Sequence, residues 1–374
     1  MAESWVTQNE RERRHALLRR LMAESGLDTL LIVGSPQVCG RGYFRYITDW
    51  SVWSSGGYAL FFAKDDPIVV MRAKSQAYWS KQIWVKDSRS AEKAVVEVGR
   101  VLAEKRPASG VVGIVGMGEF MSLQDYFYLQ AELPSLRFQD ASAIFDRAMR
   151  VKSAEEIGHV EATARILDEG FQCFAEMIAP GRTGWELSAE LQKALYGQGC
   201  LHSVILISTE PGPYNAAPGE RPLSSDDIVK FSLEACGPSG HWVEIGGMFS
   251  FRRPPDYLAD RFDSTLEAVE RAVAKMRPGF TVGDVGEEIE NTVARRGHRV
   301  GHWSGHACGL GLIEPPMIGK GEPTPLEAGM ELALHPNIIG AELEMGIYVS
   351  QTYIVEEAGA RQLSRFPNEW HLVS

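Results

Sequence analysis

Three histidines stand four residues apart in the stretch HRVGHWSGHACGLGLIEPP, which runs from His298 to Pro316. Imidazole groups bind transition metals and transfer protons near neutral pH, so this spacing could serve either chemistry. A helix would place His298, His302 and His306 on one face, but the surrounding glycines favour a strand or loop. In an extended segment, the even spacing still places His302 and His306 on the same face. His298 is expected at the end of the preceding helix, in solvent.

The composition favours a small-molecule or peptide partner. The chain has 374 residues, of which 44% are hydrophobic, and this length predicts two domains. A net charge of −11 argues against a nucleic-acid surface. No apolar run reaches the ~20 residues of a membrane span, and the start MAESWVTQNERERRH lacks signal-peptide features, so we expect a cytoplasmic location. Five cysteines without CxxC spacing indicate neither a disulfide framework nor a zinc ribbon.

The first 150 residues alternate between helix and strand patterns, which predicts a small α/β domain. The expected elements are a helix over 11–26 that stops at Gly26, a strand over 29–34, two strands within 58–72, a helix over 89–106, a strand over 110–116 and a helix over 123–133. After FDRAMRVK, Ser153 and Glu156 have the spacing of a capping box that opens a long helix. We therefore predict two domains, 1–150 and 151–374.

The second domain repeats its own order of elements. The segments PGRT at 180–183 and PGFT at 278–281 each end one helix and cap the next, with an acidic residue three positions beyond the threonine. Downstream, PLSSDDIVKFSL and PLEAGMELALHP each predict a turn that leads into a strand. Such a repeat predicts two related halves with a pocket between them, in which Ser232 and His335 occupy equivalent positions.

This order of elements resembles the creatinase, aminopeptidase P and prolidase family. The best motif is His302-Trp-Ser-Gly-His306, continued by Gly309, Leu310 and Glu314-Pro-Pro, which is similar to the family's HxxGHGIGLxxHEPP. The resemblance spans the whole chain. It implies the fold class α/β (α+β), with an N-terminal creatinase-like domain and a C-terminal pita-bread domain that has an internal pseudo-twofold repeat.

The resemblance also implies a homodimer, in which the N-terminal domain of one chain borders the pocket of the other. Aromatic side chains near residue 50 would suit such a wall, although a core cluster is the alternative. They are Tyr43, Phe44, Tyr46, Trp50 and Trp53.

The same resemblance implies five metal-ligand positions, which this sequence fills differently. Metallopeptidases of the family hold two metal ions with two Asp, one His and two Glu side chains. The matching positions here are Ser232, Glu244, His306, His335 and Ser350. One carboxylate and two histidines do not suffice for two cations, which need bridging and balancing oxygens. A single ion on Glu244, His306 and His335 stays open as an alternative, if these side chains converge.

We therefore expect a metal-independent hydrolase without a cofactor, which cleaves a C–N or related bond in a small polar metabolite. Creatinase, which resembles this chain and lacks metal, cleaves such a bond with a proton-shuttling histidine. The matching region of this chain has Pro218 and Gly219 instead, so that mechanism does not transfer directly. His306 and His335 are the expected acid–base residues, and Glu244 is expected to orient a cationic or hydrogen-bonding group of the substrate.

Further polar side chains are expected to contact the substrate. They are His302, His241, Glu342, Glu344, Arg45, Tyr46, Ser232 and Ser350. Glu342 and Glu344 alternate in AELEMG and so could share one face, whereas Arg45 and Tyr46 lie in RGYFRYITDW, which resembles the family's NxRYLT segment.

Two rival functions remain open at this stage. One is a mononuclear-metal hydrolase similar to Xaa-Pro peptidases, and the other is a noncatalytic protein that binds a small molecule or a partner in the same pocket. In each case we expect a small-molecule or peptide-like ligand, no nucleic acid and no membrane.

Overall fold

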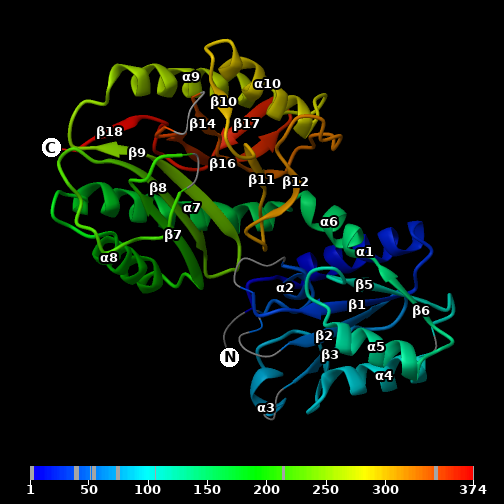
Figure 1. Cartoon of the computed structure of the whole chain (residues 1–374). Coiled ribbons are helices and arrows are strands. Elements are labelled where there is room, and N and C mark those ends of the chain that lie inside the picture. Colours follow the sequence, from blue (N-terminus) through cyan, green and yellow to red (C-terminus); the bar gives the residue numbers. More distant parts are fainter. Residues whose placement is uncertain are drawn as a thin grey trace. The chain divides into compact units, whose positions relative to one another are not determined.

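The computed structural model describes residues 4–37, 42–50, 52, 56–72, 76–105, 107–212, 215–340 and 344–373. The chain divides into two compact units, Met1–Arg150 and Val151–Ser374, each with its own sheets and helices (Figure 1). Within the described ranges, no helix combines the length and the apolar character that crossing a membrane requires.

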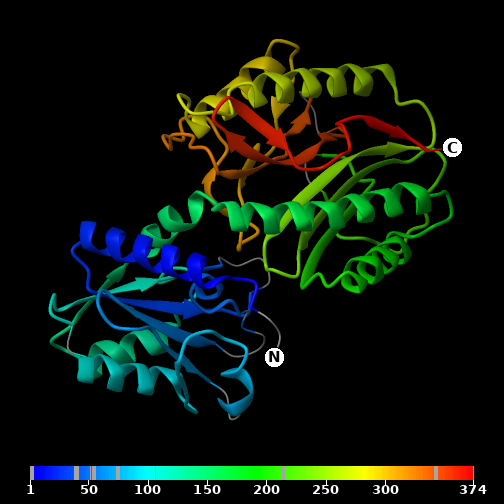
Figure 2. The same cartoon turned by 180° about the vertical axis from the view of Figure 1, so that it is seen from behind.

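The first unit is built on a six-stranded mixed sheet in the order β4-β3-β2-β1-β5-β6. Its strands are β1 (Thr29–Gly34), β2 (Gly57–Phe62), β3 (Ile68–Met71), β4 (Asp87–Ser90), β5 (Val111–Val115) and β6 (Arg137–Asp140). Its helices are α1 (Gln8–Glu24), α2 (Tyr43–Thr48), α3 (Gln76–Trp79), α4 (Ala94–Lys105), α5 (Leu123–Glu132) and α6 (Ser142–Arg150). Because α4 and α5 cover one face and α1 and α6 the other, β1 is buried along its whole length (Figures 1 and 2).

Most local predictions for this unit agree with the structure. The helix α1 ends just before Gly26, whose φ of 66° lies in the left-handed region that favours glycine. The helix expected over 89–106 is wrong at its start, because Asp87–Ser90 form an edge strand that pairs in parallel with β3. Backbone pairing holds this polar edge strand, and the side-chain pattern carries no signal for it.

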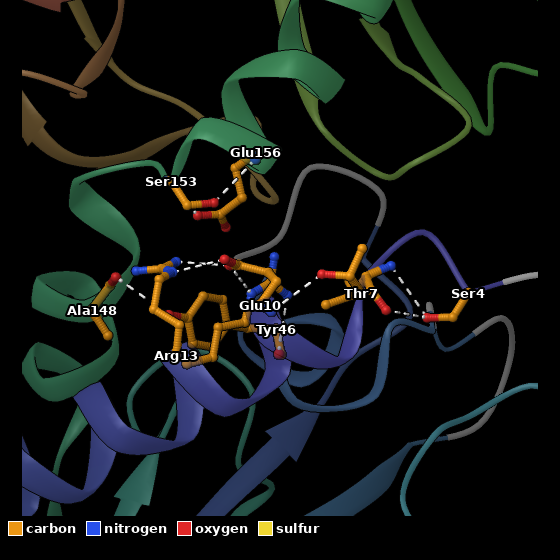
Figure 3. A network of polar contacts seen from close by, with 10 residues as sticks. Ser4, Thr7, Glu10, Arg13, Tyr46, Ala148, Ser153 and Glu156 are labelled. Carbon is orange, nitrogen blue, oxygen red and sulfur yellow. Dashed lines mark hydrogen bonds and ion pairs between the residues drawn. The ribbon is translucent and has the colours of Figure 1, made fainter.

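A buried ion-pair network fixes the start of α1 (Figure 3). Thr7 caps the helix by accepting a hydrogen bond from the backbone N–H of Glu10. The Glu10 carboxylate accepts from Arg13 Nε at 2.7 Å and from Arg14 Nε at 2.8 Å. The Arg14 guanidinium lies 4.5 Å from the centre of the Tyr46 ring and donates to the Tyr46 carbonyl. Tyr46 therefore contributes to the interior of this unit.

The second unit contains a nine-stranded sheet and a three-stranded sheet. The large sheet runs β12-β11-β13-β16-β9-β8-β7, with β17 paired to β16 and β18 to β9, and the small one runs β10-β14-β15. The helices are α7 (Ala154–Met177), α8 (Gly184–Gly197), α9 (Asp256–Val273) and α10 (Val282–Ala294). The strands are β7 (His202–Ser208), β8 (Ile228–Cys236), β9 (Trp242–Ser250), β10 (Arg299–Val300), β11 (Gly305–Ala307), β12 (Glu314–Met317), β13 (Glu331–Leu334), β14 (Asn337–Ile339), β15 (Ile347–Tyr348), β16 (Ser350–Glu356), β17 (Gly359–Gln362) and β18 (Trp370–Leu372).

Side-chain alternation along β8 and β9 separates the two faces of the large sheet. Odd-numbered residues such as Phe231 and Leu233 pack in the apolar core with α7 and α8. Even-numbered Ser232, Glu234 and Glu244 therefore point to the opposite face of the sheet. The helices α9 and α10 cover the β11, β13 and β16 part of the sheet through a second apolar core.

The repeat expected from the sequence is visible in equivalent contacts. The helices α8 and α10 both begin with a complete capping box, on Thr183 and Thr281 respectively. Each threonine also forms an isolated bridge with the proline that opens its downstream turn, Pro222 in one half and Pro325 in the other. The long helix α7 begins with the predicted capping box of Ser153 (Figure 3).

We predict that Thr183→Ala and Thr281→Ala each lower the free energy of unfolding by about 1 kcal/mol, because each change removes a side-chain acceptor from a helix N-terminus. The repeat makes the two losses similar in size. Urea denaturation followed by tryptophan fluorescence would measure them, with Thr183→Ser and Thr281→Ser as controls that keep the hydroxyl. A Thr→Ala loss no larger than that of its serine control would contradict the prediction.

Candidate active site

Glu244 lies at the centre of a buried polar cluster on the face of the large sheet that carries the even-numbered residues. Its side chain is 3% exposed, and its Oε1 accepts a hydrogen bond from Ser350 Oγ at 2.6 Å. Thr352 fixes the backbone of Glu244 from the neighbouring strand β16, since its hydroxyl contacts both the N–H and the carbonyl. Burial raises the pKa of the Glu244 carboxyl above its usual range, although His306 and Ser350 oppose this shift.

His306 reaches the same point from β11. Its Nδ1 lies 3.0 Å from the carbonyl of Ala307, and because a carbonyl only accepts, Nδ1 is the donor. In the neutral ring Nε2 is then an acceptor, and it lies 3.7 Å from Glu244 Oε2. Gly305 allows β11 to lie close to β13, because a Cβ there would lie 2.1 Å from the Ala333 carbonyl oxygen.

His335 follows directly after β13 and completes the cluster. Its Nε2 lies 3.8 Å from Glu244 Oε1, and its ring centre is 5.0 Å from that of His306. Burial lowers the pKa of His335 to about 4, so the ring is neutral at pH 7. Ligand atoms of Glu244, His306 and His335 all lie within 4.8 Å of one another. The convergence on which the single-ion alternative depends is therefore present.

A pocket of about 210 Å³ opens onto this cluster. Its described lining is Leu206, Asn215, Glu234, Glu244, His302, Trp303, His306, Ile313, His335, Asn337 and Tyr348. His302 and His306 both line it, although His302 lies in a bend before β11 and only His306 belongs to the strand. Burial lowers the pKa of His302, which also favours its neutral form.

Glu234 is a pocket residue that the sequence analysis missed. It pairs directly with Glu244 across β8 and β9, and its Oε1 accepts from Ser232 Oγ at 3.1 Å. Burial, and next the nearby Glu244, raise the pKa of Glu234 to about 8. The available signal was its spacing of two from Ser232, which places both side chains on one face of a strand.

Tyr348 is a second pocket residue that the sequence analysis missed. Its hydroxyl lies 2.8 Å from Ser232 Oγ, and burial raises its pKa well above the usual value. Gly246 makes room for the ring, because a Cβ there would lie 2.5 Å from Tyr348 Cε1. Ser232 and Ser350 thus act behind the lining, where they hold Tyr348, Glu234 and Glu244.

Several of the expected substrate contacts are placed elsewhere. His241 precedes β9 on the face toward α7, where its ring stacks on His159 at 5.6 Å. Glu344 forms an ion pair with the buried Arg261 of α9, because a buried guanidinium needs a counter-charge. Neither side chain belongs to the described lining of the pocket. Glu342 lies outside the described residues, as does Trp53 of the expected aromatic wall.

Arg45 and Tyr46 belong to the first unit. Both are buried in α2, where Arg45 lies 4.0 Å from Asp49 and Tyr46 packs against Arg14. The structure describes them as part of that unit alone, so their contact with a substrate stays a prediction.

A second buried polar group supports the turn after His306. Lys152 Nζ lies 3.5 Å from Glu314 Oε2, while Glu314 Oε1 accepts from the backbone N–H of Gly311. Glu331 is fully buried beside them and accepts from Cys308 Sγ at 3.4 Å. Burial raises the pKa of Glu331 to about 8, although Lys152 opposes the shift. This carboxyl is therefore mostly protonated at neutral pH.

The comparisons with known proteins agree with this architecture. Residues 158–357 match the model described as "Metallopeptidase family M24", which is more than half of the chain, and residues 14–151 match "Creatinase/Prolidase N-terminal domain". The chain belongs to metallopeptidase family M24. These matches confirm the family resemblance and the fold class that were predicted from the sequence. Membership of this family makes the chain a hydrolase.

The relatives of this M24 chain include proteins named as peptidases and one named as a hydrolase of a small molecule. The uncharacterized peptidase YqhT of Bacillus subtilis (strain 168) is 23% identical over 370 residues, which cover 94% of this chain and 98% of the relative. The ectoine hydrolase of Halomonas elongata is 22% identical over 290 residues, 72% of this chain and 71% of the relative. The structure of an Xaa-Pro dipeptidase from Bacillus anthracis has a TM-score of 0.84 at 20% identity, covering 97% and 99% of the two chains, which shows the shared fold.

The family name implies metal, and the described side chains fit one ion but not two. At two of the five ligand positions stand the hydroxyls of Ser232 and Ser350, which hydrogen-bond to neighbouring side chains. A single ion fits the rest. The imidazole nitrogens of His306 and His335 lie 3.7 and 3.8 Å from the Glu244 oxygens, which is too long for hydrogen bonds but allows bonds of about 2 Å from both groups to a shared cation. Glu244, His306 and His335 would hold it.

We predict that Glu331→Gln flattens the dependence of stability on pH. The folded-state pKa of about 8 lies above the unfolded value of 4.5, so the folded state binds the proton more tightly. This contribution is fully present below pH 4.5 and is lost as pH rises through 8, whereas glutamine cannot ionise.

Urea denaturation of both proteins at about pH 5 and about pH 8 would measure this effect. We expect the free energy of unfolding of Glu331→Gln to rise relative to the natural protein at the higher pH. Equal differences at the two pH values would contradict the prediction.

Proposed function

We propose that this protein hydrolyses a C–N bond in a small polar substrate, with one metal ion held by Glu244, His306 and His335. The observation that carries the proposal is the convergence of three buried acceptor groups within 4.8 Å. Two imidazoles and one carboxylate form a ligand set that leaves coordination positions open, as catalytic sites require. A bound ion would polarise the scissile carbonyl and lower the pKa of a bound water.

The chain's own residues prepare this chemistry. The Ala307 carbonyl accepts the hydrogen bond from His306 Nδ1, which leaves Nε2 unprotonated and directed at the proposed metal position. Metal-binding histidines are commonly oriented by such a hydrogen bond on their second ring nitrogen. Ser350 orients the Glu244 carboxylate in the same way. His302 is then the pocket imidazole left for proton transfer, because its lowered pKa keeps the ring neutral and able to accept.

The metal-independent hydrolase expected from the sequence is the second candidate. It is favoured by Ser350, which stands at one of the ligand positions and donates to Glu244. In this form His306 Nε2 would take a proton from water and pass it to the leaving nitrogen, while Glu244 stabilises the imidazolium. His335, neutral at pH 7, would act as a second acceptor.

Peptide-like substrates are supported by the family and by relatives named as peptidases, and a small polar metabolite by the relative named as an ectoine hydrolase. The pocket volume of about 210 Å³ suits a small substrate such as a dipeptide or a metabolite. The homodimer and the cytoplasmic location stay predictions from the resemblance and the composition.

Elemental analysis of protein purified without a His tag distinguishes the metal-dependent hydrolase from the metal-independent one. We expect about one zinc, manganese or iron ion per chain, with turnover of small amides and Xaa-Pro dipeptides lost when a chelator removes it. His306→Ala and His335→Ala should each bind well below one ion and lose at least about 100-fold in turnover.

His298→Ala is the matched control, because His298 lies outside the described pocket lining beside Asp260. It should keep both the metal and the turnover. Metal well below one per chain, together with turnover that survives chelation, would contradict the metal form and support the metal-independent one. Turnover unchanged in both His306→Ala and His335→Ala would contradict both forms.

A further inference from the structure

We propose that Glu234 forms a subsite for a protonated nitrogen of the substrate, such as an ammonium or amidinium group. The inference rests on the proposed hydrolase function and names the substrate class for it. A residue in this position would decide which small C–N compounds the pocket accepts.

The first support is the position of Glu234 opposite the reactive cluster. Glu234 and Glu244 are direct partners in the register of β8 and β9, and side chains in such pairs lie about 5 Å apart on one face of the sheet. Both carboxyl groups line the pocket, but Glu234 does not belong to the group of three convergent ligands. Its side chain is therefore placed to contact the part of the substrate beside the scissile bond.

A hydrogen-bond chain behind the pocket orients this carboxyl group. Ser232 Oγ donates to Glu234 Oε1 at 3.1 Å, so the single hydroxyl proton of Ser232 is used there. Tyr348, whose hydroxyl lies 2.8 Å from Ser232 Oγ, must then be the donor to Ser232. The chain from Tyr348 through Ser232 ends on Glu234 as an acceptor, which is the role needed to bind N–H donors.

The charges of the lining give the second support. The described lining contains two glutamates and no lysine or arginine, so where these glutamates are ionised a ligand carboxylate would meet like charge without a basic partner. Trp303, which is 43% exposed, adds an aromatic face to this lining, and such faces attract cations. The proposed metal ion would balance Glu244, and a bound protonated nitrogen would supply the counter-charge for Glu234, which no lysine or arginine of the described lining provides. Asn215 and Asn337 could instead serve a neutral polar group, which is the main competing outcome.

Three probes of matched shape separate these outcomes. Pentanamidine, pentanamide and pentanoate have equal numbers of non-hydrogen atoms and carry a positive charge, no charge and a negative charge. Isothermal titration calorimetry of the full-length protein as purified would measure their affinities at about pH 9, where a pKa of about 8 leaves the Glu234 carboxyl mostly ionised. We expect pentanamidine to bind at least about tenfold more tightly than pentanamide, because hydrogen bonds to an ionised group are the stronger ones, and pentanoate to bind most weakly.

Glu234→Gln keeps the shape of the side chain and removes its charge. We expect this variant to bind pentanamidine and pentanamide with affinities within about threefold of each other. Glu190→Gln is the control, since Glu190 is exposed on α8, and it should keep the full preference. Thermal unfolding of all three proteins would confirm that they are folded.

Three results would overturn the proposal. They are no binding of pentanamidine to the natural protein, binding of pentanamide or pentanoate as tight as that of pentanamidine, and an undiminished preference in folded Glu234→Gln. Because these measurements need no turnover, their failure leaves the hydrolase proposal intact. Conversely, a retained charge preference beside failed metal and turnover measurements would contradict the hydrolase proposal alone.

Discussion

A buried carboxylate faced by two imidazole nitrogens is the constraint around which the second unit is organised. Glu244, His306 and His335 converge without an arginine or lysine in the described lining, so a cation or a shared proton must balance them. Hydrogen bonds from outside the cluster hold Glu244 and His306 in this arrangement. Ser350 donates to the carboxylate, and the Ala307 carbonyl fixes the tautomer of His306.

The family resemblance supplied these residues from the sequence, and strand alternation explains why Glu244 lies on the pocket face. The period of two along β8 and β9 sends apolar odd-numbered side chains to the helices and polar even-numbered ones to the pocket face. The motif around His306 and the paired caps at Thr183 and Thr281 were strong local signals, and the structure contains the caps where they were expected. Fold and family followed from such signals because they depend on short stretches of chain.

The sequence could not predict which side chains pair with each other across the fold. Glu344 was expected at the pocket, but the buried Arg261 of α9 pairs with it, and no local pattern announces that pairing. His241 lies just before β9, and its ring stacks on His159 of α7 instead of facing the pocket. Glu234 was not predicted, although its parity matches Ser232, because it is not one of the five ligand positions that the family resemblance implies.

The strand pairing that joins the two repeated halves affects the order in which the chain folds. Glu244 lies on β9 in the first half, whereas His306, His335 and Ser350 come from the second, and β9 meets β16 through only two register pairs, Ser350 with Gly246 and Gln351 with Ile245. Contacts between segments this far apart in sequence carry a higher loop-closure cost than local contacts do. Each half can bury its own helices before this junction closes, so we expect the reactive centre to be among the last features to form as the chain folds.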